Sequence, residues 1–65
     1  MIPDAVDETG LLLRRDGGFV LQRDRGGYYR LELHRMPVDL VEKRVRVIGR
    51  LIDADHVDAD GVQPA

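Results

Sequence analysis

Two short glycine-containing turns, set between segments that alternate apolar and polar residues, constrain the fold of this chain most strongly. The turn at residues 16–18, Asp-Gly-Gly, separates residues 11–15 from 19–23. The turn at residues 24–26, Asp-Arg-Gly, separates the second segment from residues 27–33. Tight glycine turns between short alternating segments are typical of β-hairpins. The pattern therefore predicts a three-stranded antiparallel meander of the kind found in small β-barrels.

Both turns predict the same division of residues between two faces. If each is a three-residue loop with a left-handed final residue, Leu13 faces Leu21, and Leu21 faces Tyr29. The predicted inner face holds Leu11, Leu13, Phe19, Leu21, Tyr29, Leu31 and Leu33. The predicted outer face holds Leu12, Arg14, Val20, Gln22, Tyr28, Arg30 and Glu32.

The second half of the chain predicts a short helix and two further strands. Residues 36–43 contain Pro37, which suits a first helical position, and we expect one to two helical turns there. Residues 44–52 alternate as a strand, in which Gly49 predicts a bulge or a sharp bend. A turn at 53–55 and a last strand at 56–62 follow, with a bulge near Gly61.

Three strands, a short helix and two strands are the element order of the OB-fold. Segments 10–13, 19–21, 29–33 and 43–49 resemble small bacterial single-domain OB-fold-like proteins of unknown function. The resemblance covers residues 9–62, and Val41-Glu42 stands where those proteins often carry a glycine. It implies an all-β, five-stranded OB-like barrel with one short helix. The alternative is an SH3-like barrel, which would lack a helix between the third and fourth strands.

Charge is distributed unevenly along the chain. Residues 1–9 carry three acidic and no basic side chains, and residues 53–65 carry four acidic and no basic side chains. Residues 10–52 carry ten basic and five acidic side chains, a net charge of +5. We expect residues 1–8 to form an acidic flexible segment, 9–62 the single barrel domain, and 63–65 a tail.

The composition argues against several kinds of chemistry. There is no cysteine or serine, and Thr9 is the only threonine, so a serine or cysteine nucleophile is excluded. Asp58, Asp60 and Gly61 resemble part of a calcium-binding loop, but no glutamate follows as that loop requires. His34 and His56, the only histidines, are expected at the surface. We therefore expect no enzymatic activity, no cofactor and no metal site.

The predicted outer face suggests two classes of binding. Its apolar content favours a homodimer or another protein partner through Leu12, Val20 and Ile48. The alternative is weak binding of single-stranded nucleic acid through the second and third strands. Its candidate residues are Arg14, Gln22, Tyr28, Arg30 and Arg46.

The sequence also suggests a location. It has no apolar run of the roughly 20 residues that a membrane span needs, and no secretory signal at its start. Together with the absence of cysteine, this predicts a cytoplasmic protein that does not enter a membrane.

Overall fold

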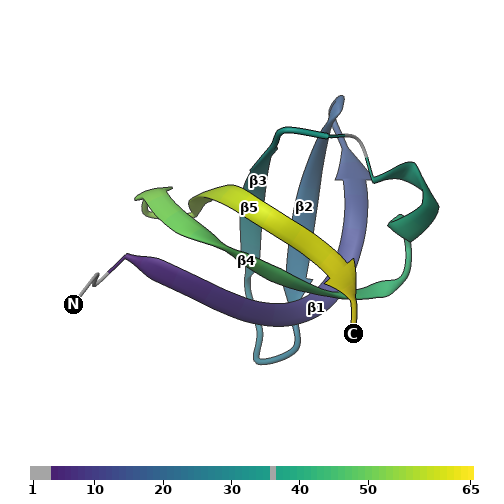
Figure 1. The fold of residues 1–65 in the computed structure, drawn as a ribbon, viewed down its shortest axis with the longest axis horizontal. Coiled ribbons are helices and arrows are strands. Elements are labelled where there is room, and N and C mark those ends of the chain that lie inside the picture. The colour runs from purple at the N-terminus through teal and green to yellow at the C-terminus, as the bar shows by residue number, and fades with distance from the viewer. Residues whose placement is uncertain (1–3, 36) are drawn as a thin grey trace.

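The computed structural model describes residues 4–35 and 37–65 of the chain. They form an all-β structure of five strands and one turn of 3-10 helix, η1. The elements are β1 (Ala5–Arg15), β2 (Gly18–Arg23), β3 (Tyr28–Leu33), η1 (Val38–Leu40), β4 (Arg44–Asp53) and β5 (His56–Pro64). Neighbouring strands pair in the order β1-β2-β3-β5-β4, and β4 pairs with β1, so the sheet closes into a ring (Figure 1).

Strand β1 connects the two sides of this ring because its halves pair with different neighbours. Residues 5–11 pair with β4, and residues 10–15 pair with β2. Gly10 belongs to both stretches, and a Cβ atom there would lie 2.9 Å from the Cα atom of Arg23. Glycine is therefore required where the β2 backbone comes closest to the bent strand. Figure 1 shows β1 running along the molecule and then turning into the first hairpin.

The strands extend beyond the predicted domain limits at both ends. Residues 5–8, expected to lie in a flexible acidic segment, form the start of β1, and Val6 is buried opposite Gly49. Residues 63 and 64, expected to be tail, pair with β4. Residues 1–3 of the predicted segment lie outside the described part of the chain. Backbone pairing with β4 thus draws both ends into the sheet.

The parallel pairing of β5 with β3 closes the ring. Its register runs from Arg30 opposite His56 to Leu33 opposite Ala59. Before this, β5 pairs with β4 through a register shift between Ile48 and Gly49. Because Ile48 faces Gly61 while Gly49 faces Ala59, Asp60 is the extra residue of a β-bulge. The bulge predicted near Gly61 is therefore confirmed, and Gly49 lies at this register shift on the partner strand.

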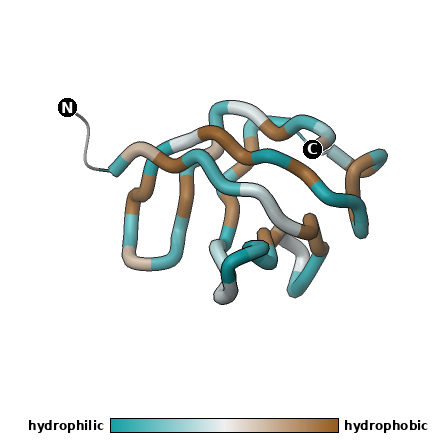
Figure 2. Tube along the Cα trace, turned by 90° about the horizontal axis from the view of Figure 1, so that it is seen from below, coloured by the Kyte–Doolittle hydropathy of each residue, from teal (hydrophilic) through white to brown (hydrophobic). Residues whose placement is uncertain are grey.

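The interior of the ring is filled by apolar side chains from all five strands. The buried residues are Val6, Leu12, Phe19, Leu21, Leu31, Val45, Val47, Val57 and Ala59. Half-buried residues pack against them, including Tyr29 and Leu33 from β3. Leu40 and Val41, at the end of η1, also pack against this core. Figure 2 shows hydrophobic and hydrophilic stretches alternating along the strands.

The predicted register of the first hairpin is wrong by one residue. Leu12, not Leu13, lies opposite Leu21, and Arg15 lies opposite Gly18. The turn contains only Asp16 and Gly17, whose φ angles of 53° and 80° are both positive. Such a two-residue turn, with an Asp-Gly sequence, matches the right-handed twist of the paired strands. Leu12 consequently points into the core, whereas Leu11 and Leu13 point outward.

The predicted register of the second hairpin is confirmed. Leu21 lies opposite Tyr29, and Phe19 lies opposite Leu31. The Arg23 amide donates to the Gly27 carbonyl oxygen at 3.0 Å, which leaves residues 24–26 as the predicted three-residue loop, and both Gly26 and Gly27 have positive φ angles.

The predicted helix is reduced to the single turn of η1. Its three residues end at Leu40, the following Val41 is extended, and Glu42 has a φ angle of 64°. The Glu42 amide then donates to the carbonyl oxygen of Leu12 at 2.6 Å, and the Leu12 amide donates to Lys43 at 3.0 Å. These bonds to β1 take up the backbone groups that a longer helix would use. Met36, where the predicted helix began, lies outside the described residues.

No helix within residues 4–35 and 37–65 has the length and apolar character needed to cross a lipid bilayer.

Candidate binding face

The outward side of the β1–β2–β3 sheet carries an apolar patch, which we call the outer face: Leu11, Leu13 and Val20. The parity of the strands sets this orientation, since Leu12 and Leu21 point inward. Leu13 lies opposite Val20, so their side chains are cross-strand neighbours. All three residues are half-buried, yet none belongs to the apolar residues that pack on the core within the described chain. The patch therefore lies at the protein surface, outside the core.

A groove of about 450 Å³ adjoins the outer face. Its lining residues are Arg15, Asp16, Gly18, Phe19, Val20, Tyr28, Arg30, Leu31 and His56. Gly18 occupies an outward position of β2 and contributes no side chain, which leaves the surface hollow beside Val20. The Arg15 guanidinium lies 5.2 Å from the centroid of the Tyr28 ring, a cation–π contact between β1 and β3.

An ion pair and a histidine–carboxylate contact across the β3–β5 junction lie at the edge of the groove. Arg30 Nη2 is 3.4 Å from Asp55 Oδ1, and His56 Nε2 is 3.2 Å from Glu32 Oε2. Asp16 adds a further carboxylate at the β1–β2 turn. The positive and negative side chains around the groove therefore largely cancel, and the site is not strongly basic.

The structure gathers some of the predicted nucleic-acid-binding residues and separates others. Gln22, Tyr28 and Arg30 lie on the outward side of β2 and β3, and the Tyr28 side chain is exposed. Arg14 lies opposite Phe19, at a position of β1 on the same side as the buried Leu12, and its guanidinium is 5.9 Å from the centroid of the Phe19 ring. Arg46 lies on β4, where its Nε and Nη2 donate to the Asp7 carboxylate at 2.8 and 2.6 Å.

Of the three predicted interaction residues, only Val20 belongs to the outer face. Leu12 is fully buried in the core, so its assignment to the surface was wrong. The cause is the shifted hairpin register described above. Ile48 is exposed, as predicted, but it lies on β4 opposite Asp7. A two-residue reading of the Asp-Gly turn would have identified Leu11 and Leu13 instead.

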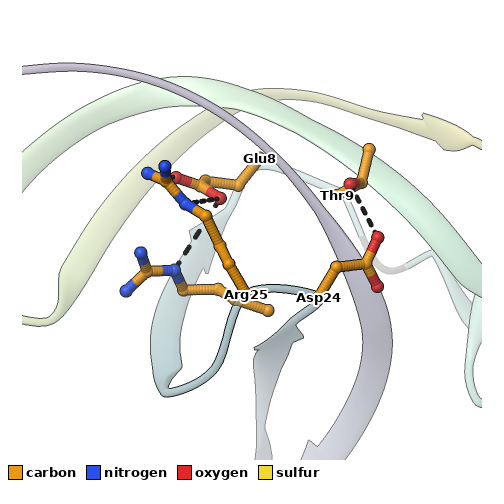
Figure 3. A network of polar contacts seen from close by, with 5 residues as sticks. Glu8, Thr9, Asp24 and Arg25 are labelled. Carbon is orange, nitrogen blue, oxygen red and sulfur yellow. Dashed lines mark hydrogen bonds and ion pairs between the residues drawn. The ribbon is translucent and has the colours of Figure 1, made fainter.

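A second polar cluster fastens the β2–β3 loop to β1 (Figure 3). Arg25 donates to the Glu8 carboxylate from Nε at 3.2 Å and from Nη2 at 2.6 Å. Thr9 Oγ1 donates to Asp24 Oδ2 at 2.9 Å, and Arg44 binds the same carboxylate. The Glu8 side chain is only 10% exposed. These contacts connect the loop to β1 and β4 and hold it against the bend of β1.

The chemistry of this cluster is that of a structural network. Hydrogen bonds from Arg44 and then from Thr9 hold the pKa of Asp24 below its ordinary value. A hydrogen bond from Arg46 lowers the pKa of Asp7 in the same way. Carboxylates held in their charged form by arginine are poor proton donors near neutral pH. Within the described residues, no group of three or more His, Cys, Asp or Glu is placed to hold a metal ion.

Comparison with known proteins gives one family. The family described as "Protein of unknown function (DUF5818)" matches residues 9–65, which is most of the chain. No curated protein and no solved structure matches the sequence significantly. On the extent of the family match, the chain belongs to the DUF5818 family, whose members have no assigned function.

Proposed function

We propose that this protein is a non-enzymatic assembly module that self-associates through its outer face. The observation that carries the proposal is the half-buried cross-strand pair of Leu13 and Val20, extended by Leu11, outside the packed core. Contiguous apolar side chains on a sheet surface are typical of sites that bind another protein. A non-enzymatic role also accords with the lack of a serine or cysteine nucleophile and with the pairing of carboxylates by arginine.

The charges that border the outer face favour a second copy of this chain as the partner. Arg44, opposite Leu11, binds the Asp24 carboxylate, and Arg30, opposite Val20, pairs with Asp55, so these two arginines are each matched by a carboxylate. A rim with balanced charge lets two identical faces meet without net repulsion, as a two-fold dimer requires. A stable interface of about 800 Å² per partner would use just under a fifth of the 4472 Å² surface.

We propose further that the ring of strands is an OB-like barrel and that the protein is cytoplasmic. Support comes from the closed strand order and from β5, which returns beside β3 as a parallel neighbour. A simple meander pairs consecutive strands only in antiparallel fashion, whereas a Greek-key connection of this type belongs to the OB arrangement. The absence of cysteine accords with a reducing compartment.

Sedimentation equilibrium over a wide range of protein concentration tests self-association. We expect a monomer–dimer equilibrium that Leu13→Glu weakens at least tenfold, because a buried unpaired carboxylate opposes the contact. Ile52→Glu is the matched control, since Ile52 is exposed on β4, outside the outer face. A wild-type protein that stays monomeric throughout, or equal effects of the two variants, would refute the proposal.

A second candidate function is weak binding of single-stranded nucleic acid. The observation in its favour is the exposed Tyr28 ring, 48% accessible, beside Arg15 and Arg30. An exposed aromatic ring between arginines can stack on a base while the arginines contact phosphates. Fluorescence anisotropy with a labelled oligonucleotide at several salt concentrations tests it. Binding that falls with salt and with Tyr28→Ala would support this function, and the absence of salt-dependent binding would exclude it.

A further inference from the structure

The groove beside the outer face owes its shape to one residue. Gly18 stands at an outward position between Arg15 on β1 and Val20, and it leaves a hollow that a side chain would occupy. Its φ angle is not positive, and an added Cβ atom would come no nearer than 3.8 Å to the Arg15 carbonyl oxygen. Neither the backbone nor the surrounding space requires glycine at this position. The hollow can therefore be filled by mutation without strain.

Two arginines at the groove are available to an added anion. Arg15 forms no ion pair with a carboxylate in the described residues, and its guanidinium rests on the Tyr28 ring. Arg30 contacts Asp55 at 3.4 Å, longer than the 2.6 Å contacts that Arg25 and Arg46 make with their carboxylates. Strong charge-assisted hydrogen bonds are typically about 2.7–2.9 Å long. The Arg30 pair is therefore one that a better-placed anion can replace.

The remaining lining of the groove suits a flat apolar group. Val20 and the exposed Tyr28 ring contribute apolar surface, while Phe19 and Leu31 border the groove as buried core residues. A volume of about 450 Å³ lies within the usual range of small-ligand sites, about 300–1,000 Å³. Such sites combine an apolar lining with a few polar groups that fix the ligand. Here the polar side chains are Arg15, Arg30, His56 and, at the β1–β2 turn, Asp16, and the two arginines are the groups that can hold an anion.

We propose that this groove binds a small aromatic phosphomonoester. Its ring lies between Tyr28 and the apolar lining, and its phosphate oxygens contact Arg15 and Arg30. A phosphate offers three oxygens to guanidinium groups that come from different strands, whereas a carboxylate offers only two. The proposal does not depend on self-association, because the phosphate contacts use residues of a single chain.

Amide chemical shifts measured by NMR test the proposal, with phenyl phosphate as the probe. We expect saturable shifts at Gly18, Val20, Arg30 and His56, with a dissociation constant on the order of millimolar for so small a ligand. Inorganic phosphate, which lacks the ring, and phenol, which lacks the charge, should each bind at least tenfold more weakly. Benzoate should bind between these limits. Because Val20 belongs to both the outer face and the groove, the titration is made at a protein concentration at which sedimentation shows monomer, which separates this site from the self-association proposal.

Two variants locate the site within the groove. Arg15→Gln should weaken phenyl phosphate binding about tenfold, because it removes one charged contact. Gly18→Val should abolish binding by filling the hollow, while the spectrum stays well dispersed. Arg50→Gln is the control, since Arg50 lies on β4 and does not line the groove. Shifts spread over the whole surface, equal binding of inorganic phosphate, or full affinity in Arg15→Gln would overturn the proposal.

Discussion

Comparing Leu12→Ala with Leu13→Ala tests the orientation of β1 and, with it, the position of the outer face. The two residues are neighbours of the same type, but Leu12 is fully buried and Leu13 is half-buried outside the packed core. Truncating a fully buried leucine to alanine costs about 2–5 kcal/mol, through lost apolar burial and the cavity left behind. A half-buried surface leucine should cost at most about 1 kcal/mol.

The expected loss at Leu12 is a large part of the total stability. At 0.05–0.15 kcal/mol per residue, a 65-residue chain has roughly 3–10 kcal/mol of unfolding free energy. Urea unfolding followed by circular dichroism measures both variants against the wild type. If Leu12→Ala does not fold, Leu12→Val gives a smaller loss of about 1 kcal/mol that can still be measured. A larger cost at Leu13 than at Leu12 would show that the strand faces the other way.

Two further substitutions test the bend of β1 and the polar network around it. Gly10→Ala should strongly destabilise the folded protein, because the added Cβ atom would press on the β2 backbone. Gly61→Ala is the control and should not, because there is open space around Gly61. Thermal unfolding of the two variants compares them directly. Because the pKa values of Asp7 and Asp24 are lowered in the folded state, their ion pairs contribute stability above the ordinary aspartate pKa, and this contribution is lost as pH falls through the folded values. Asp24→Asn should therefore flatten the acidic limb of a plot of urea midpoint against pH, and an unchanged limb would contradict the assignment.

Several features of the fold could be predicted from local sequence because only one arrangement satisfied the pattern. In the second hairpin, the alternation around Phe19 and Leu21 on one side and Tyr29 and Leu31 on the other allows a single buried parity. The alternating valines at 45 and 47 specify the inward side of β4 in the same way. Gly49, a glycine inside an alternating strand, indicated an irregularity in the pairing of β4, because it offers no side chain to pack.

The first hairpin lacked such a restriction. Residues 11–13 are all leucine, so either parity of β1 places leucine in the core, and hydrophobic pattern alone cannot choose between them. The choice rests on the turn, since Asp16 and Gly17 adopt positive φ angles and shorten the loop by one residue. The predicted interaction surface was displaced for this reason, and the groove at Gly18 went unnoticed.

The all-β class, the positions of the turns and most of the core follow from the amino-acid sequence alone, because they depend on short-range alternation and turn chemistry. The segments that pair over long distances along the chain take their conformation from tertiary contacts. Ala5–Thr9 become strand because β4, about 40 residues later, binds their backbone, and Glu42 and Lys43 leave the helix because β1 takes their hydrogen bonds. Those hydrogen bonds join backbone groups that no local pattern of side chains brings together, so they become predictable only once the ring of strands is closed.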